Sequence, residues 1–168
     1  FHNLFAESED NALAGRLELA CAANPAPLLV PPVIQSFIKN HPNVDIRLHE
    51  GDMEQVVNYL KNGTADLALT YDFVLDNDIE FEKIAHLTPF AIMSAKNPLA
   101  KRKSLSLPDL VDAPLILLDS PGYREFFFNY FGSYNLRPNV RYLPSTNEMV
   151  RGLLSNGTGY SMALVKIK

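Results

Sequence analysis

Four places in the sequence put polar residues at the start of a predicted helix, directly after a predicted strand. They are Asn24-Pro25, Asp52-Met53, the run Ser120, Pro121, Gly122 and Tyr123, and Ser145-Thr146. The first turn of a helix exposes backbone N–H groups at the positive end of its dipole, which suits an anionic or polar ligand. The residue pattern therefore predicts a binding site for a small molecule. A second explanation for Asp52, Ser145 and Thr146 is that they only cap their helices, which requires no ligand.

Residue types that would support catalysis or bind a metal do not converge in this sequence. The four histidines have no metal-ligand spacing among themselves or with Cys21. Ser120 lacks the Gly-x-Ser-x-Gly setting of a nucleophile elbow, and no His and acid follow it in the hydrolase order. Gly157-Thr158-Gly159 follows a predicted helix and precedes a strand, which is the reverse of a dinucleotide-binding loop. We expect no catalytic residue, no metal and no cofactor.

The segment from residue 44 to residue 72 predicts the element that positions these residues. Val44, Ile46 and Leu48 alternate with polar residues, as in a half-buried strand. Asp52-x-x-Gln55 resembles a helix capping box. Gly63 stands where a glycine in the left-handed conformation would end the helix. Leu67 to Leu69 begin a second, more continuously apolar strand.

A strand, helix and strand in this order form a βαβ unit, which requires a parallel sheet. Ligands of such sheets bind beyond the carboxyl ends of the strands. In this segment those ends lie around Glu50 to Met53 and Thr70 to Asp72.

Apolar periodicity predicts the remaining elements. Residues 1–14 are expected to be the end of a helix that begins upstream. Pro31 and Pro32 are compatible only with the first turns of the next helix, because neither can donate an amide hydrogen. Ser145-x-x-Glu148 predicts a second capping box. Further strands are expected at residues 17–22, 79–84, 89–94, 115–118, 140–143 and 159–164, and further helices at residues 30–38, 106–110, 123–134 and 146–156.

The composition limits the protein class. A chain of 168 residues with 47% hydrophobic content can bury a core, and a net charge of -4 gives no basic surface for nucleic acid. No apolar run approaches the ~18 residues that span a bilayer, and the N-terminus lacks the order of a signal peptide. We therefore expect a cytoplasmic protein with no membrane partner. Cys21, within an apolar strand, is expected to be a buried thiol.

Several motifs in a fixed order resemble the regulatory domain of LysR-type transcriptional regulators. They are "GRLELACAANPAPLLVPPVIQSFIKNHPNVDIRLHEGD", "LKNGTADLALTYD", "MSAKNPLA", "SLPDL" and "LLSNGTGYSMA", and the resemblance covers residues 12–164. It implies an α/β fold of the two-lobed periplasmic-binding-protein-like type 2, in which each lobe is a mostly parallel sheet flanked by helices. Residues 1–14 would be the end of a linker helix, 15–88 lobe 1 and 89–168 lobe 2, with the C-terminal return to lobe 1 missing.

The resemblance also implies a function. A small-molecule effector, such as an organic acid or another polar metabolite, would bind in the cleft between the lobes. DNA would be bound only through a winged helix-turn-helix domain absent from this segment. A homodimer or tetramer would form, with the helix at residues 30–38 against the partner's helix at 146–156. The effector-binding residues would be Asn24, Pro25, Asp52, Met53, Thr70, Tyr71, Ser120, Pro121, Gly122, Tyr123 and Thr146.

Tyr71 departs from the family pattern, because several relatives carry a basic residue at this strand end. The difference counts against a simple carboxylate effector. Two other functions remain open at this point. A solute-binding protein of a transport system has the same fold but requires an export signal upstream. An enzyme on this scaffold would require an acid-base pair or a nucleophile at the strand ends.

Overall fold

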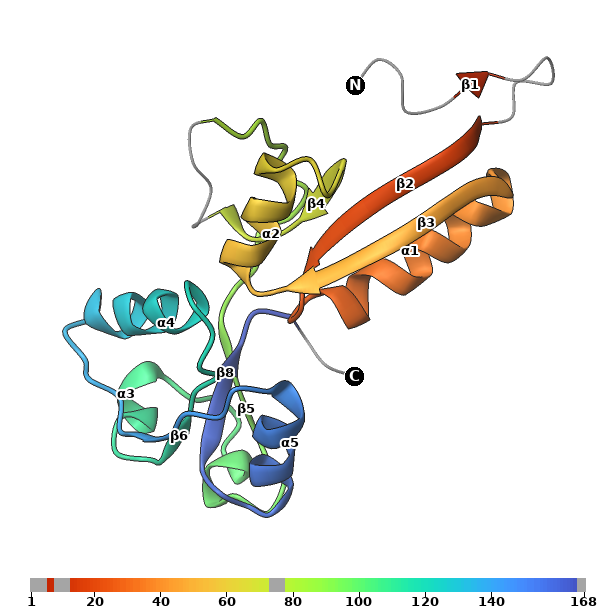
Figure 1. Ribbon diagram of the computed structural model, residues 1–168. Helices are drawn as coiled ribbons and strands as arrows, with labels where there is room; N and C mark the ends of the chain where they lie inside the picture. The colour runs from red at the N-terminus through yellow and green to blue at the C-terminus, as the bar shows by residue number, and fades with distance from the viewer. Residues whose placement is uncertain (1–5, 8–12, 73–77, 166–168) are drawn as a thin grey trace. The chain divides into compact units, whose positions relative to one another are not determined.

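The computed structural model of the chain describes residues 6–7, 13–72 and 78–165 (Figure 1). The chain divides into two compact units, the first ending at Phe81 and the second beginning at Glu82. The sequence predicted the division between residues 88 and 89, a few positions later.

The first unit is built on strand β2 (Leu13–Ala22), which lies at the centre of a four-stranded sheet. It pairs in parallel with β3 (Asn43–Gly51) and β4 (Leu67–Leu69), and in antiparallel fashion with β1 (Ala6–Glu7). Helix α1 (Ala26–Asn40) joins β2 to β3, and α2 (Met53–Lys61) joins β3 to β4. The βαβ prediction is confirmed for both helices.

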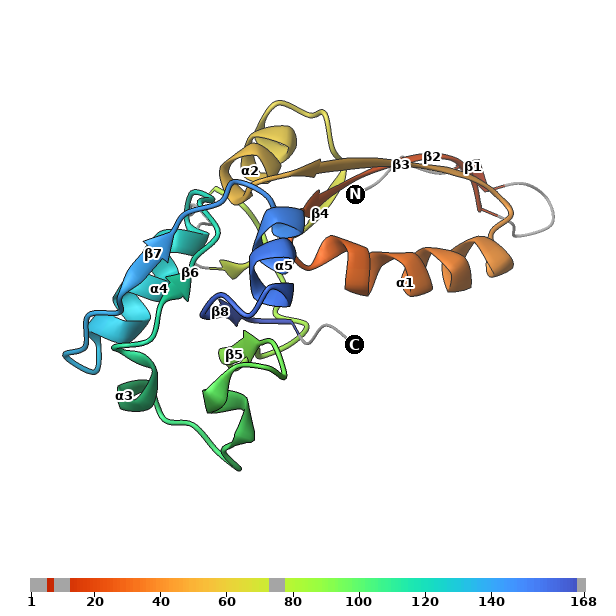
Figure 2. The same ribbon diagram turned by 90° about the horizontal axis from the view of Figure 1, so that it is seen from below.

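The two helices cover opposite faces of this sheet (Figure 2). Neighbouring residues of a strand point to opposite faces, so Ala20 and Cys21 enter different clusters. Ala20 packs with Val56 of α2 and with Ala65, whereas Cys21 packs with Ala26 and Val30 of α1. Cys21 is a buried free thiol, as predicted, and its pKa is raised by burial and by the charge of Glu50.

Three predictions for the first unit were wrong where the structure describes the chain. Residues 6, 7, 13 and 14 lie in strands, because β1 hydrogen bonds to β2, and not in the end of a helix. Helix α1 begins at Ala26, before the predicted start at residue 30, and Pro31 and Pro32 lie in its second turn, in agreement with their expected place in the first turns. Both prolines are exposed, so water can reach the carbonyl groups that lose an amide partner. Residues 79–84 form no strand, and Ile84 is 74% exposed.

The second unit has a sheet in the order β5-β8-β6-β7. Its central strand β6 (Leu115–Ile116) is parallel to β7 (Val140–Tyr142) and β8 (Tyr160–Ala163), and β5 (Phe90–Met93) is antiparallel to β8. A 3₁₀ helix η2 (Pro98–Lys101) and helices α3 (Leu107–Leu110), α4 (Tyr123–Gly132) and α5 (Asn147–Ser155) complete the unit.

The core of the second unit consists of strand residues and of the aromatic side of α4. Phe127 and Phe131 are fully buried, as are Leu115 and Tyr160 from the sheet. Asn97 is one of the few buried polar residues, and its Nδ2 donates to the carbonyl oxygen of Gly159 at 2.8 Å. This bond ties the loop before η2 to the start of β8.

The helix caps follow the sequence at one predicted position and shift by one residue at the other. Asp52 Oδ1 accepts from the Gln55 backbone N–H, and the Asp52 N–H donates to Gln55 Oε1, both at 2.9 Å. The predicted capping box of α2 is therefore confirmed. The N-cap of α5 is Thr146, not Ser145, and its Oγ1 accepts from the backbone N–H of Met149 at 3.2 Å. In the described part of the chain, no helix has the length and apolar character to cross a membrane.

Two glycines, one inside α5 and one just after its end, provide a matched test of this fold. Gly157 ends the helix at φ +80° and Gly152 lies inside it, and an added Cβ would meet no atom within 4 Å at either. Gly157→Ala should lower the free energy of unfolding by ~1–2 kcal/mol, because an L side chain disfavours the left-handed conformation. Gly152→Ala should raise it by ~0.5–1 kcal/mol. Chemical denaturation measures both, and equal effects would contradict the described end of α5.

Candidate functional site

The carboxyl ends of three strands in the first unit lie at one edge of its sheet. Ala22 of β2 is the register partner of Gly51 in β3, and Cys21 is the partner of Leu69 in β4. Adjacent strands are ~4.8 Å apart, so the ends of β3 and β4 flank the end of β2 on its two sides. The predicted site residues of this unit are therefore brought to one edge, and they are Asn24, Pro25, Asp52, Met53, Thr70 and Tyr71.

Thr70 is the most informative of these residues. Its Oγ1 is buried and has no hydrogen-bond partner among the described residues. A buried hydroxyl without a partner costs roughly 1–3 kcal/mol, so such groups are uncommon in folded proteins. Thr70 immediately follows β4, where ligands of parallel sheets bind. A bound molecule at this edge would supply the missing partner.

The other residues of this edge contribute differently. Met53 and Pro25 have apolar side chains. Met53 is buried, and Pro25, the N-cap of α1, has no backbone N–H to donate. Asp52 is half-buried and uses Oδ1 to cap α2. Tyr71 is half-buried, and burial raises its pKa to about 12, so its hydroxyl is neutral at pH 7. Asn24 is also half-buried.

The second unit has a corresponding edge. The backbone N–H of Asp119, after β6, donates to the carbonyl oxygen of Pro144, after β7, at 2.8 Å. Tyr123 begins α4, and its hydroxyl donates to the carbonyl oxygen of Met162 in β8 at 3.1 Å. The structure therefore brings the predicted residues of this unit to one edge, and they are Ser120, Pro121, Gly122, Tyr123 and Thr146. Because Tyr123 is 6% exposed and its hydroxyl is used within the unit, its role there is structural.

A charged cluster at the start of α4 was not predicted. Glu125 Oε2 accepts from the backbone N–H of Gly122 at 2.8 Å. Arg124 donates to Asp119 and, at 2.8 Å, to Glu125 Oε1. The pKa of Glu125 is lowered by its own backbone N–H, by Arg124 and by the Gly122 N–H, against a smaller effect of desolvation. The Gly122-x-x-Glu125 spacing is that of a capping box and was the available signal in the sequence.

The sequence predicted that the helix starts offer free backbone N–H groups to a ligand, and some of these groups are already bonded. The Gln55 N–H of α2 is held by Asp52, the Gly122 N–H of α4 by Glu125 and the Met149 N–H of α5 by Thr146. At the start of α1, Pro25 and Pro27 have no N–H at all. One backbone N–H at the start of each of α2, α4 and α5 is therefore already bonded, and α1 has fewer donors than predicted.

The described residues contain no arrangement for metal chemistry. Within residues 6–7, 13–72 and 78–165, no three His, Cys, Asp or Glu side chains lie close enough to hold a metal ion. His49 Nε2 lies 2.7 Å from Glu18 Oε2, and its ring packs on Tyr59. Both contacts are on the α2 face of the first sheet and are explained by packing.

Comparison with known proteins identifies the family. Residues 10–164 match the family described as LysR substrate binding domain. The chain belongs to this family. It is 30% identical over 149 residues to the transcriptional activator CmpR of Synechocystis, covering 88% of this chain and 49% of CmpR. It is 26% identical over 149 residues to the regulator CysL of Bacillus subtilis, covering 88% of this chain and 50% of CysL.

Solved structures of LysR-type proteins share the fold. HinK of Pseudomonas aeruginosa matches with a TM-score of 0.86 and 33% identity, over 93% of this chain and 54% of HinK. The effector-binding domain of QuiR in complex with shikimate matches with a TM-score of 0.76 and 24% identity, over 89% of this chain and 73% of that domain. The effector-binding domain of BenM with its effector benzoate matches with a TM-score of 0.76 and 22% identity, over 90% of this chain and 73% of that domain.

The comparisons confirm the predicted fold class, a two-lobed α/β fold of the type 2 periplasmic-binding-protein-like group. They place the chain with domains of transcriptional regulators, so the transport-protein alternative is not favoured. The family is one of ligand-binding domains and not of enzymes. The chain spans about half the length of the curated relatives CysL and CmpR.

The buried bond of Tyr123 gives a test of its structural role. Tyr123→Phe leaves the Met162 carbonyl oxygen without this donor and should lower the free energy of unfolding by ~1–2 kcal/mol. Tyr134→Phe is the control, because this side chain is exposed and its ring lies against that of Tyr130. Thermal and urea unfolding should show no change for the control. An unchanged stability of Tyr123→Phe would contradict the assignment.

Proposed function

We propose that this chain is the effector-sensing domain of a LysR-type transcriptional regulator that works in the cytoplasm. A small polar molecule binds at strand ends of the domain and is released unchanged. Its effect is to favour one of two conformational states of the regulator over the other. DNA is bound by another part of the intact regulator.

The observation that carries this proposal is the unpartnered hydroxyl of Thr70 at the end of β4. Two further observations support it. The predicted site residues of each unit lie at one edge of that unit's sheet, and related effector-binding domains have been solved with shikimate and with benzoate. The absence of a convergent nucleophile or acid-base pair at these edges supports binding without reaction.

The mechanism follows from differential affinity. A ligand shifts a conformational equilibrium only by the difference between its binding free energies to the two states. An effector supplies this difference when its bonds to the strand-end groups are stronger in one state than in the other. The change in the population of the two states is then transmitted to the DNA-binding domains of the regulator.

Thr70→Val tests the site. In a thermal-shift screen of organic acids, aromatic compounds and amino acids, a true effector at a hundredfold excess over Kd should stabilise by ~2.7 kcal/mol. Thr70→Val should weaken binding about tenfold or more, equivalent to ~1.4 kcal/mol. The free protein should keep or gain stability, because the methyl group replaces a buried hydroxyl that has no described partner.

Thr64→Val is the matched control for this variant, because Thr64 is exposed in the turn after α2. Its affinity for the effector should equal that of the unaltered protein. If Thr70→Val binds the effector with full affinity, the proposed site is wrong.

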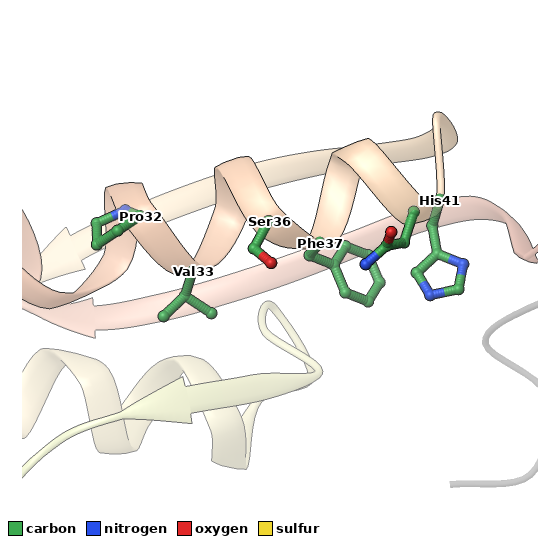
Figure 3. Close-up of a pocket in the computed structure, with 6 residues that line it drawn as sticks. Pro32, Val33, Ser36, Phe37 and His41 are labelled. Atoms are coloured by element: carbon green, nitrogen blue, oxygen red, sulfur yellow. The ribbon is translucent and has the colours of Figure 1, made fainter.

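We also propose that the protein forms a head-to-tail dimer, or a tetramer of such dimers, through α1 and α5. One face of α1 carries a shallow groove of about 480 Å³ lined by Pro32, Val33, Ser36, Phe37, Asn40 and His41 (Figure 3). Val33 is 66% exposed, and Met149 of α5 is 56% exposed. Large apolar side chains exposed together on a helix are typical of an interface. A partner's α5 is the proposed occupant of the groove.

Val33→Glu tests this dimer. A charge in the centre of the groove should raise the dimer dissociation constant at least tenfold, because it would be buried without a partner. Phe128→Glu is the control, since Phe128 is exposed on α4, outside the proposed interface. Sedimentation at tens of micromolar measures the mass. A monomeric mass for the unaltered protein would contradict the proposal.

A further inference from the structure

We infer that the two units carry opposite charges which select the partner surface in self-association, so that the first unit of one copy meets the second unit of another. The inference rests on the proposed dimer and adds the interaction that orients it. It also makes the association sensitive to ionic strength.

The net charge of the chain is the sum of two opposite charges, one on each unit. The first unit, residues 1–81, contains 13 Asp and Glu against 4 Lys and Arg, a net charge of -9. The second unit, residues 82–168, contains 6 Asp and Glu against 11 Lys and Arg, a net charge of +5. The value of -4 for the whole chain therefore describes neither unit.

The basic residues of the second unit exceed the acids available to pair with them. Arg102 is bonded to Asp109, and Arg124 is bonded to Asp119 and Glu125, so half of the acids of this unit are already paired. Six other basic side chains of the unit are exposed and form no ion pair within the described part of the chain, and they are Lys96, Lys101, Lys103, Arg137, Arg141 and Arg151.

The backbone that carries the three lysines is held in place by a buried residue. Asn97, which is 7% exposed, donates through Nδ2 to the carbonyl oxygen of Gly159 at 2.8 Å. No acidic residue occurs between Lys83 and Asp109, so this loop has no negative charge of its own. The fold therefore presents a fixed basic loop at the surface of the second unit.

The apolar groove of α1 does not by itself specify its partner. Helix α1 contains no acidic residue, and α5 contains one acidic and one basic residue, Glu148 and Arg151. Two copies could also join groove to groove, because one exposed apolar surface can cover another. A two-fold dimer of that kind brings two units of charge -9 together, whereas a head-to-tail dimer brings -9 next to +5 twice. The charges favour the head-to-tail arrangement and oppose the pairing of like units.

A second copy of the chain fits these charges better than a nucleic acid does. DNA is negative along its whole length, so the second unit would attract it. The first unit carries the larger charge and would repel it. A second copy offers both signs and can satisfy both units at once.

Screening by salt gives the inference a measurable signature. Charges interact over ~30 Å at 0.01 M ionic strength and over only ~3 Å at 1 M. Apolar burial is not screened in this way. Between ~0.02 M and ~0.5 M NaCl, the dissociation constant of the dimer should therefore rise at least tenfold in sedimentation equilibrium of the unaltered chain.

Two charge-matched double variants locate the attraction. Lys101→Gln with Lys103→Gln lowers the charge of the second unit from +5 to +3, and Arg16→Gln with Arg47→Gln changes the first unit from -9 to -11. Both variants have a net charge of -6, and all four positions are exposed. At low salt the lysine variant should raise the dissociation constant about threefold or more, and the arginine variant should leave it unchanged or lower it. Urea unfolding checks that both variants fold.

The outcomes separate this inference from the proposed dimer. A dimer that Val33→Glu dissociates but whose dissociation constant is the same at both salt concentrations would overturn the inference and leave the dimer in place. Equal weakening by the two double variants would also overturn it, because only the total charge would then matter. A lysine variant that keeps its dimer but loses binding to a short DNA duplex would overturn it in favour of a nucleic acid. A monomeric mass at both salt concentrations would count against both proposals.

Discussion

The parallel pairing of β2 with its two neighbours is the constraint on which the first unit depends. Cys21 and Ala22 are in register with the ends of β4 and β3, so all three strands stop at one edge. A shift by one residue would move Ala20 and Cys21 to the wrong faces and bury polar neighbours in their place. The same pairing that fills the core therefore places Asp52 and Thr70 at the same edge of the sheet, after the two strands that flank β2. The hydrogen bonds that pair β2 with β3 and β4 therefore fix both the core and the positions of the candidate site residues.

The sequence predicted the fold well where short-range chemistry determines it. The Asp52-x-x-Gln55 box and the glycine after α2 both lie where the pattern placed them. Residues 79–84 alternate like a strand but form none, because alternation describes the residues of one strand and not the partner that must pair with it. At α5 the sequence offered Ser145 and Thr146 as adjacent caps, and only backbone geometry selects between them.

The sequence predicted which residues follow the strands, but not which of their polar groups are already bonded. Parallel topology brings Thr70 and Ser120 to strand ends, as the pattern required. The electrostatics depend on which groups are already bonded, and this is not visible in residue types. Glu125 occupies the Gly122 N–H, and Pro25 and Pro27 remove donors from α1. Part of the donor capacity of these helix starts is thereby removed by the chain itself.

The central claim is that a small molecule binds at the strand ends of this domain. Amide chemical-shift mapping with a bound ligand tests it most directly, because it reports each position separately. The account predicts the largest shifts at residues 24, 52, 53, 70, 71, 120, 122, 123 and 146. Shifts confined to the exposed face of α1, or to the outer surface of α4, would contradict it.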